Sequence, residues 1–273
     1  MMLEPINKYL DDAPRPAATA EQVGKFSLFR PAGPWKYYAR PRLGLNEPII
    51  VADVDALRSR QHELQLPENI EWVVEIAPSL AAAAAGSGLN IVLYPLLVLE
   101  PRAQLTIAAP DGIEIRLLSP DDPDFARAHA VAEVGFRVPG TQIGPEGASE
   151  RDELQAATST AMAEFQRTRV RDGLSISYAA FDDEGGPLCV GTHQPVGDVT
   201  EIVGVATLPA ARRRGLAVAL TSALVADARA RGVKTVFLSA GGEDVARIYD
   251  RVGFRRTGSA GAAEPFTSAK RSS

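Results

Sequence analysis

The second half of the chain alternates between short apolar runs and segments with helical spacing. Apolar runs bounded by turn residues predict strands at residues 113–118, 174–181, 187–192, 197–208 and 233–239. Helical spacing predicts helices at residues 119–136, 155–170, 215–231 and 244–252. In the third of these helices, Leu216, Leu220 and Leu224 recur at every fourth position and therefore share one face. The pattern predicts an α/β domain.

The first half has a less regular pattern. Residues 1–30 are polar and rich in Pro and Ala, which indicates a loosely held arm or a short helix. Strands are predicted at residues 49–54, 70–76 and 91–99, and a helix at 78–85 that is stopped by Gly86 and Gly88. Residues 100–112 contain two prolines and a glycine, and the chain restarts there. We therefore expect a boundary near residue 110, with an N-terminal α/β region at 1–110 and a second domain at 111–273.

Composition and charge exclude several classes of protein. The 273 residues are 45% hydrophobic and 23% charged, with a formal net charge of −5, which is typical of a globular chain. No basic block is interleaved with aromatic residues, so no nucleic-acid partner is expected. The longest apolar run, residues 91–99, is too short to span a membrane, and no secretory leader is visible. These features predict a cytoplasmic protein without a membrane partner.

The sequence contains few residues that could bind a metal ion or form a disulfide. A single cysteine, Cys189, excludes an internal disulfide framework. His, Cys and Asp residues nowhere show metal-ligand spacing, so no metal is expected.

The segment from 200 to 224 carries the most informative motif. A predicted strand ends at Leu208, Pro209 interrupts it, and a turn rich in Arg and Gly opens a long helix. A helix N-terminus has free N–H groups and a partial positive charge, and Gly215 lets an anion approach the backbone. The turn lacks the Lys-Ser/Thr pair of a P-loop and the GxGxxG pattern of a dinucleotide fold. An anion site of another type is therefore indicated, and the alternative is an ordinary charged helix start.

This turn, 212–217 (RRRGLA), resembles the Q/R-x-x-G-x-G/A motif of the GNAT acyltransferases. The order strand, proline, motif, helix, strand and short helix ending in IYDRVGF is similar to that family over residues 112–258. The resemblance implies a GNAT fold, with a mixed central sheet flanked by helices, and acetyl-CoA as the acyl donor. It implies that backbone groups of Val205, Ala206 and Thr207 pair with pantetheine. It also implies that the CoA pyrophosphate is held by the six motif residues: Arg212, Arg213, Arg214, Gly215, Leu216 and Ala217.

Two side chains are candidates for proton transfer. Removal of a proton from the attacking ammonium needs a base. Glu201 lies among apolar residues in TEIVGVA, where burial raises a carboxyl pKa, and the string resembles the strand that carries the base in histone acetyltransferases. In the resemblance, Tyr249 protonates the leaving thiolate. The alternatives are a cross-strand ion pair for Glu201 and a packed ring for Tyr249.

Other positions carry weaker expectations. His193 precedes Glu201 by one turn and is a candidate acceptor contact, although a lone histidine is more often structural. Many GNAT relatives have an asparagine just after the strand that precedes the helix of Tyr249. This chain reads SAGGED there, so the contact that the asparagine makes is absent or is made by Ser239.

The first half echoes the end of the second. Residues 70–99 and 235–254 both read strand, helix, Gly-apolar pair and strand, with Gly88-Leu89 matching Gly253-Phe254. One interpretation is a tandem GNAT arrangement with a degenerate first copy, and the other is coincidence.

The expected function is direct acyl transfer from acyl-CoA to a primary amine on a small molecule or peptide. The alternative is a non-catalytic acyl-CoA sensor. A homodimer remains an open expectation.

Overall fold

A computed structural model of the chain describes residues 3–103, 107–183 and 186–266. The described residues fold into two compact units. The first unit contains those up to residue 94 and those from 258 to 266, and the second unit contains those from 95 to 257. The division runs through two strands, β5 (Asn90–Leu99) and β11 (Phe254–Glu264), so each strand contributes one part to each unit. The sequence-based boundary near 110 was placed at a change in composition, whereas the chain passes from one unit to the other within these strands.

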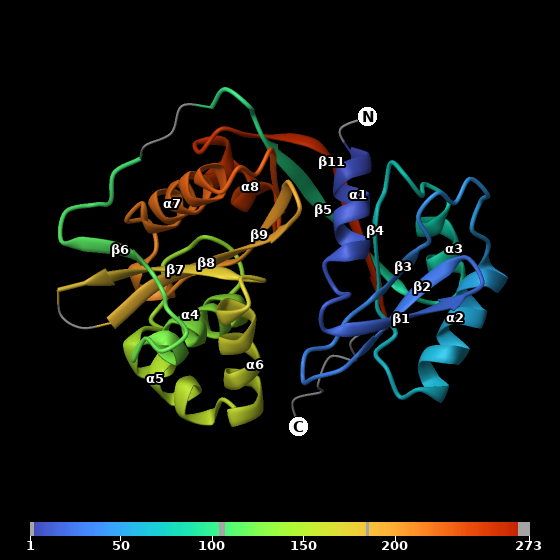
Figure 1. Ribbon diagram of the computed structural model, residues 1–273, viewed down its shortest axis with the longest axis horizontal. Coiled ribbons are helices and arrows are strands. Elements are labelled where there is room, and N and C mark those ends of the chain that lie inside the picture. Colours follow the sequence, from blue (N-terminus) through green and yellow to red (C-terminus); the bar gives the residue numbers. More distant parts are fainter. Residues whose placement is uncertain (1–2, 104–106, 184–185, 267–273) are drawn as a thin grey trace. The chain divides into compact units, whose positions relative to one another are not determined.

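The second unit is a mixed sheet with helices on both faces (Figure 1). Its strands follow the order β5, β10 (Thr235–Ser239), β9 (Val199–Thr207), β8 (Gly186–Val196), β7 (Ile176–Asp182) and β6 (Ile113–Leu117). β9 and β10 are parallel, while the other neighbours in β6–β9 are antiparallel.

Helices α4 (Phe125–Arg137) and α7 (Leu216–Ala230) pack on opposite faces of this sheet. A Cβ added to Gly135 of α4 would lie 2.9 Å from Ala206 Cβ. The preceding residue, Val205, is within reach of the α7 face, where Leu220 and Leu224 surround Gly191. Because neighbouring residues of a strand point to opposite faces, the two helices lie on the two sides of β9. Helix α8 (Glu243–Asp250) shares a core cluster with α7.

The predicted helix at 155–170 is two helices, α5 (Ala148–Ala157) and α6 (Thr160–Arg171). Ser159 interrupts it because its hydroxyl accepts the N–H of Met162 at 3.2 Å and so caps a new helix.

The first unit contains α1 (Leu3–Asp12), a hairpin of β1 (Ala18–Val23) and β2 (Phe26–Pro31), and β3 (Ala39–Pro41). These are followed by α2 (Val51–Glu63), β4 (Ile70–Val73) and α3 (Leu80–Gly86). The strand order is β1, β2, β3, β4 and β11. Residues 3–30 are therefore mostly ordered helix and strand, and not the loose arm that was one of the two expectations.

The strand predicted at residues 49–54 is wrong, because α2 begins there. The Asp53 carboxylate accepts the Ile50 N–H at 2.9 Å and closes the first helical turn. Val54 and Leu57 are three residues apart and so lie on one face of the helix, where both are buried in a hydrophobic core.

The two units repeat one order of elements. β3, α2, β4, α3 and β5 follow one another in the first unit as β9, α7, β10, α8 and β11 do in the second. In both series the first two strands are parallel, through the pair Ala39↔Ile70 and through three pairs that start at Val199↔Thr235. The echo between residues 70–99 and 235–254 therefore corresponds to a repeated topology.

Candidate active site

Strands β9 and β10 separate midway along β9. Their parallel register consists of Val199↔Thr235, Thr200↔Val236 and Glu201↔Phe237. β9 continues to Thr207, where it pairs with β8 alone among the described strands. The backbone N–H and C=O groups on the open edge of 202–207 are thus available to an extended ligand.

A bulge lies in the part of β9 beyond this point. Val203 pairs with Thr192 and Ala206 with Val190, so Gly204 and Val205 together face one residue of β8. Gly204 has a φ of 65°, which a glycine adopts without strain. The predicted pantetheine residues Val205, Ala206 and Thr207 all lie on this open part of β9.

The turn after β9 leads into the N-terminus of α7. Arg213 has a φ of 67° and Gly215, the N-cap of α7, has a φ of 83°. Arg213, Arg214 and Gly215 are exposed, and a Cβ at Gly215 would meet only Pro110 Cγ, at 3.9 Å. The position of Gly215, at the start of the first turn that contains the N–H groups of Leu216 and Ala217, is therefore open among the described residues. Free amides, the helix dipole and two guanidinium groups together form a site for an anion.

The Arg212 side chain bonds to main-chain groups within the protein. Its guanidinium donates to three main-chain carbonyls: Gly135 O at 2.9 Å, Val138 O at 2.7 Å and Gln142 O at 3.1 Å. Partial burial lowers the pKa of Arg212. The loop after α4 is thereby held against the turn that precedes α7. This role depends on residues about seventy positions away and has no local sequence signal.

Glu201 lies at the last pair before the strands separate. Thr200 and Ile202 face α7, because Thr200 bonds to His193 beneath that helix and Ile202 belongs to its core cluster. The half-buried Glu201 side chain therefore points to the other face, the one that α4 covers. Its position beside the splay suits a group that contacts a ligand there.

Tyr249 of α8 is 7% exposed, and its ring centroid lies 6.0 Å from that of Phe254. Burial raises the pKa of the phenol, and the nearby Cys189 adds to the shift. Cys189 is opposite Thr207, whose hydroxyl donates to its sulfur at 3.2 Å. The hydroxyl group of Tyr249 therefore favours its protonated form, and Cys189 places the ring near the open end of β9.

Cys189 itself is fully buried, and burial raises the pKa of its thiol to about 12. A thiol in this state is not a nucleophile.

His193 does not face an acceptor. Its ring is fully buried between β8 and α7, with Nδ1 3.1 Å from Thr200 Oγ1 and Nε2 2.9 Å from Asp227 Oδ2. Burial lowers the pKa of His193, although Asp227 opposes the shift. With both nitrogens bonded and no exposed surface, the ring has a structural position.

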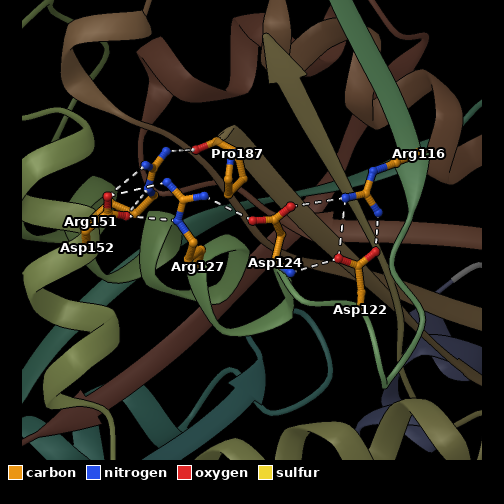
Figure 2. A network of polar contacts seen from close by, with 7 residues as sticks. All are labelled: Arg116, Asp122, Asp124, Arg127, Arg151, Asp152 and Pro187. Atoms are coloured by element: carbon orange, nitrogen blue, oxygen red, sulfur yellow. Dashed lines mark hydrogen bonds and ion pairs between the residues drawn. The ribbon is translucent and has the colours of Figure 1, made fainter. Parts of the chain in front are cut away.

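A network of charged residues, called the ladder below, connects α4 and α5 on one face of the sheet (Figure 2). Arg127 of α4 bonds to Asp124 and to Asp152 of α5, both at 3.1 Å. The buried Arg151 bonds to Asp152 at 2.8 Å and to the Pro187 carbonyl of β8 at 2.9 Å. At the other end, Arg116 of β6 pairs with Asp122 and Asp124 (Figure 2). The ladder ties α4 and α5 to the sheet that carries the site, and sequence reasoning missed it.

Two other kinds of feature are not found in the described ranges. None of the helices in residues 3–103, 107–183 and 186–266 is long and apolar enough to cross a bilayer. Within the same ranges, no three His, Cys, Asp or Glu side chains are grouped to hold a metal ion.

Comparison with known proteins agrees with this geometry. Residues 149–254 match the acetyltransferase (GNAT) family. No curated protein matches the chain.

Several solved structures share the fold. A GCN5-related N-acetyltransferase from Kribbella flavida is 20% identical with a TM-score of 0.72, over 97% of this chain and 96% of that one. A putative GNAT-family acetyltransferase from Novosphingobium aromaticivorans is 20% identical with a TM-score of 0.57, over 96% and 97%. A tandem GNAT protein from the clavulanic acid biosynthesis pathway is 17% identical with a TM-score of 0.56, over 89% and 79%.

The splayed strands, the bulge and the open N-terminus of α7 all lie in or beside the matched segment. The chain has the GNAT fold, and its residues 149–254 match the acetyltransferase (GNAT) family.

Proposed function

We propose that the protein is an N-acyltransferase that moves an acetyl or other short acyl group from acyl-CoA to a primary amine. The observation that supports this most directly is the end of the β9–β10 pairing at Glu201↔Phe237, next to the exposed N-terminus of α7. In this proposal, pantetheine extends along the open edge of Val205, Ala206 and Thr207. The pyrophosphate lies on the amides of residues 213–217, beside the guanidinium groups of Arg213 and Arg214.

The proposed reaction is a direct transfer. Glu201, directly or through water, takes a proton from the acceptor ammonium, and the free amine attacks the thioester carbonyl carbon. The C–N bond forms, the C–S bond breaks, and the CoA thiolate receives a proton from Tyr249. The attacking nitrogen loses its second proton as the amide forms, and this proton restores the Tyr249 hydroxyl through water. A backbone amide of the open β9 edge polarises the carbonyl oxygen. A covalent intermediate on Cys189 is not part of the proposal, because that thiol is buried and protonated.

The acceptor is a primary amine on a small molecule or peptide. A second candidate function is a non-catalytic acyl-CoA sensor that uses the same site. A buried tyrosine near the open strand and a half-buried glutamate at the splay favour the enzyme, because a sensor needs neither proton donor nor base.

The experiment that separates these functions measures release of CoA thiol from acetyl-CoA with a thiol reagent, across a panel of amines. Amine-dependent release above the rate of spontaneous hydrolysis supports the enzyme. Binding of acetyl-CoA by calorimetry without release for any amine supports the sensor. The absence of CoA binding at millimolar concentration contradicts both.

A further inference from the structure

A cavity lies in the first unit, at the place that corresponds by topology to the acyl-CoA site of the second. Its volume is about 490 Å³, within the range of small-molecule sites. It is lined by the end of β3, the loop 42–49 that leads to α2, the end of β4 with the turn after it, and the start of α1. β3 and β4 pair in parallel at Ala39↔Ile70 and then separate, as β9 and β10 do.

The cavity lacks the features that would hold a pyrophosphate. At the N-terminus of α2, the Asp53 carboxylate bonds to the Ile50 N–H and to Lys25 Nζ, both at 2.9 Å. A carboxylate already occupies the position where an anion would bind, and Pro48 supplies no N–H group. CoA is therefore not the expected ligand of this cavity.

Two hydrogen-bond donors that line the cavity are without partners. The Arg42 guanidinium has no hydrogen bond or ion pair among the described residues, and its Nε is enclosed. Trp72 is 2% exposed, and its enclosed Nε1 likewise has no partner within those residues. A Cβ at Gly261 would lie 2.4 Å from Trp72 Cε2, so the glycine makes room for the indole. Because Arg42 Nε and Trp72 Nε1 are themselves enclosed, a ligand in the cavity would meet the terminal nitrogens of Arg42, which have no acceptor among the described residues and suit a carboxylate.

The rest of the lining includes carboxylates and apolar side chains. Glu4 and Glu75 are exposed, and Glu75 Oε2 accepts the Ser259 N–H at 3.1 Å. The apolar side chains include those of Leu45, Ile49, Val73 and Ile76. The lining thus offers a cation, carboxylates and an apolar surface.

We propose that this cavity binds an α-amino acid with an apolar side chain. The Arg42 guanidinium holds the carboxylate, Glu4 and Glu75 hold the ammonium group, and the apolar side chains contact that of the ligand. Such a site goes beyond the acyl transfer proposed for the second unit and does not depend on it.

The first test compares three probes that share the leucine side chain by calorimetry on the full chain. L-Leucine carries both charges, 3-methylbutylamine lacks the carboxylate, and 4-methylpentanoate lacks the ammonium group. We expect saturable binding of L-leucine, and roughly 10- to 100-fold weaker binding of the other two, as for the loss of charge-assisted hydrogen bonds. Equal affinity for all three, or no binding of L-leucine at millimolar concentration, would overturn the proposal.

The site is located with a fluorescent reporter. The chain has two tryptophans, Trp35 and Trp72, so Trp35→Phe leaves the cavity indole as the only one. L-Leucine should change its emission with the dissociation constant that calorimetry gives. Binding by calorimetry with no change in Trp72 emission would place the ligand elsewhere.

Matched variants complete the test. Arg42→Met removes the cation and keeps a long unbranched side chain, and it should weaken L-leucine binding at least tenfold. Lys36→Met removes an exposed cation of the same unit that does not line the cavity, and should leave binding unchanged. Circular dichroism confirms folding before titration. Unchanged binding by a folded Arg42→Met protein would contradict the assignment, whether or not the second unit binds CoA.

Discussion

Asp227 of α7 lies 2.9 Å from the buried ring nitrogen Nε2 of His193 on β8. The same carboxylate accepts the Tyr178 hydroxyl at 3.1 Å and pairs with Arg231. One side chain therefore joins the helix that begins at the anion site to two strands of the sheet.

The first prediction concerns this contact. Asp227→Ala should lower the free energy of unfolding by about 1–3 kcal/mol, because it leaves buried donors of His193 and Tyr178 without an acceptor. The measurement is urea denaturation. Asp198→Ala is the control: Asp198 also pairs with a cation, Lys234 at 3.2 Å, but both side chains are more than half exposed. Its effect should stay within about 1 kcal/mol. Equal losses in the two variants would mean that the buried contact contributes nothing.

The second prediction concerns pH. Burial lowers the pKa of His193 and lowers that of His129 from 6.5 to about 4. Below pH 6.5 the unfolded chain binds protons that these folded rings do not, so their contribution to stability is full above pH 6.5 and is lost as pH falls toward 4. His129→Leu should flatten this fall. Urea denaturation between pH 7.5 and 4.5 measures it, and parallel curves for the two proteins would contradict the assignment.

The third prediction tests the anion site. Gly215→Asp should abolish CoA binding, because it puts a negative side chain where phosphate meets the backbone. Gly232→Asp is a matched control at the other end of α7: Gly232 also has a positive φ, 81°, and open space around it. Backbone strain should be similar in both, so retention of CoA affinity is expected only for Gly232→Asp. Calorimetry on folded protein decides the matter.

The fourth prediction separates Arg212 from its neighbours. Arg212→Met removes the bonds to the carbonyls of Gly135, Val138 and Gln142 and should speed hydrogen exchange in residues 136–147. Arg214→Met should weaken CoA binding and leave that exchange unchanged. If both variants lost only CoA affinity, Arg212 would be acting on phosphate.

The fifth prediction concerns proton transfer. Glu201→Gln should lower turnover by roughly 10²–10⁴-fold, and the loss should shrink as pH approaches the pKa of the amine. Tyr249→Phe removes an acid, so raising the pH should not restore its activity. A pH–rate profile of both variants with an accepted amine checks this. Wild-type turnover by Glu201→Gln at neutral pH would exclude it as the base.

The features that the sequence predicted are those marked by a residue pattern within one short segment of the chain. Helix α7 was visible because Leu216, Leu220 and Leu224 recur with helical spacing, and the anion turn because Gly215 interrupts a basic run. The start of α2 was mistaken for a strand, because residues 49–54 are apolar and only the Asp53 carboxylate shows that a helix begins there.

Features that depend on distant residues were not predictable. The carbonyls that hold Arg212 and the carboxylate that holds His193 lie far away along the chain. β11 was missed because its Gly and Ala residues show no alternation of apolar and polar positions. The cavity beside Trp72 needs Gly261, almost two hundred residues away, to leave space for the indole.

The path of β11 has a consequence for how the protein is made. Ala260–Ala263 of this strand pair with Ile70–Val73 of β4, inside the first unit. On a ribosome, β4 therefore emerges long before its partner and keeps one edge unpaired until residues 260–263 have been synthesised. The first unit cannot finish folding before β11 has emerged, and a nascent chain stalled before residue 258 should expose that edge to chaperones.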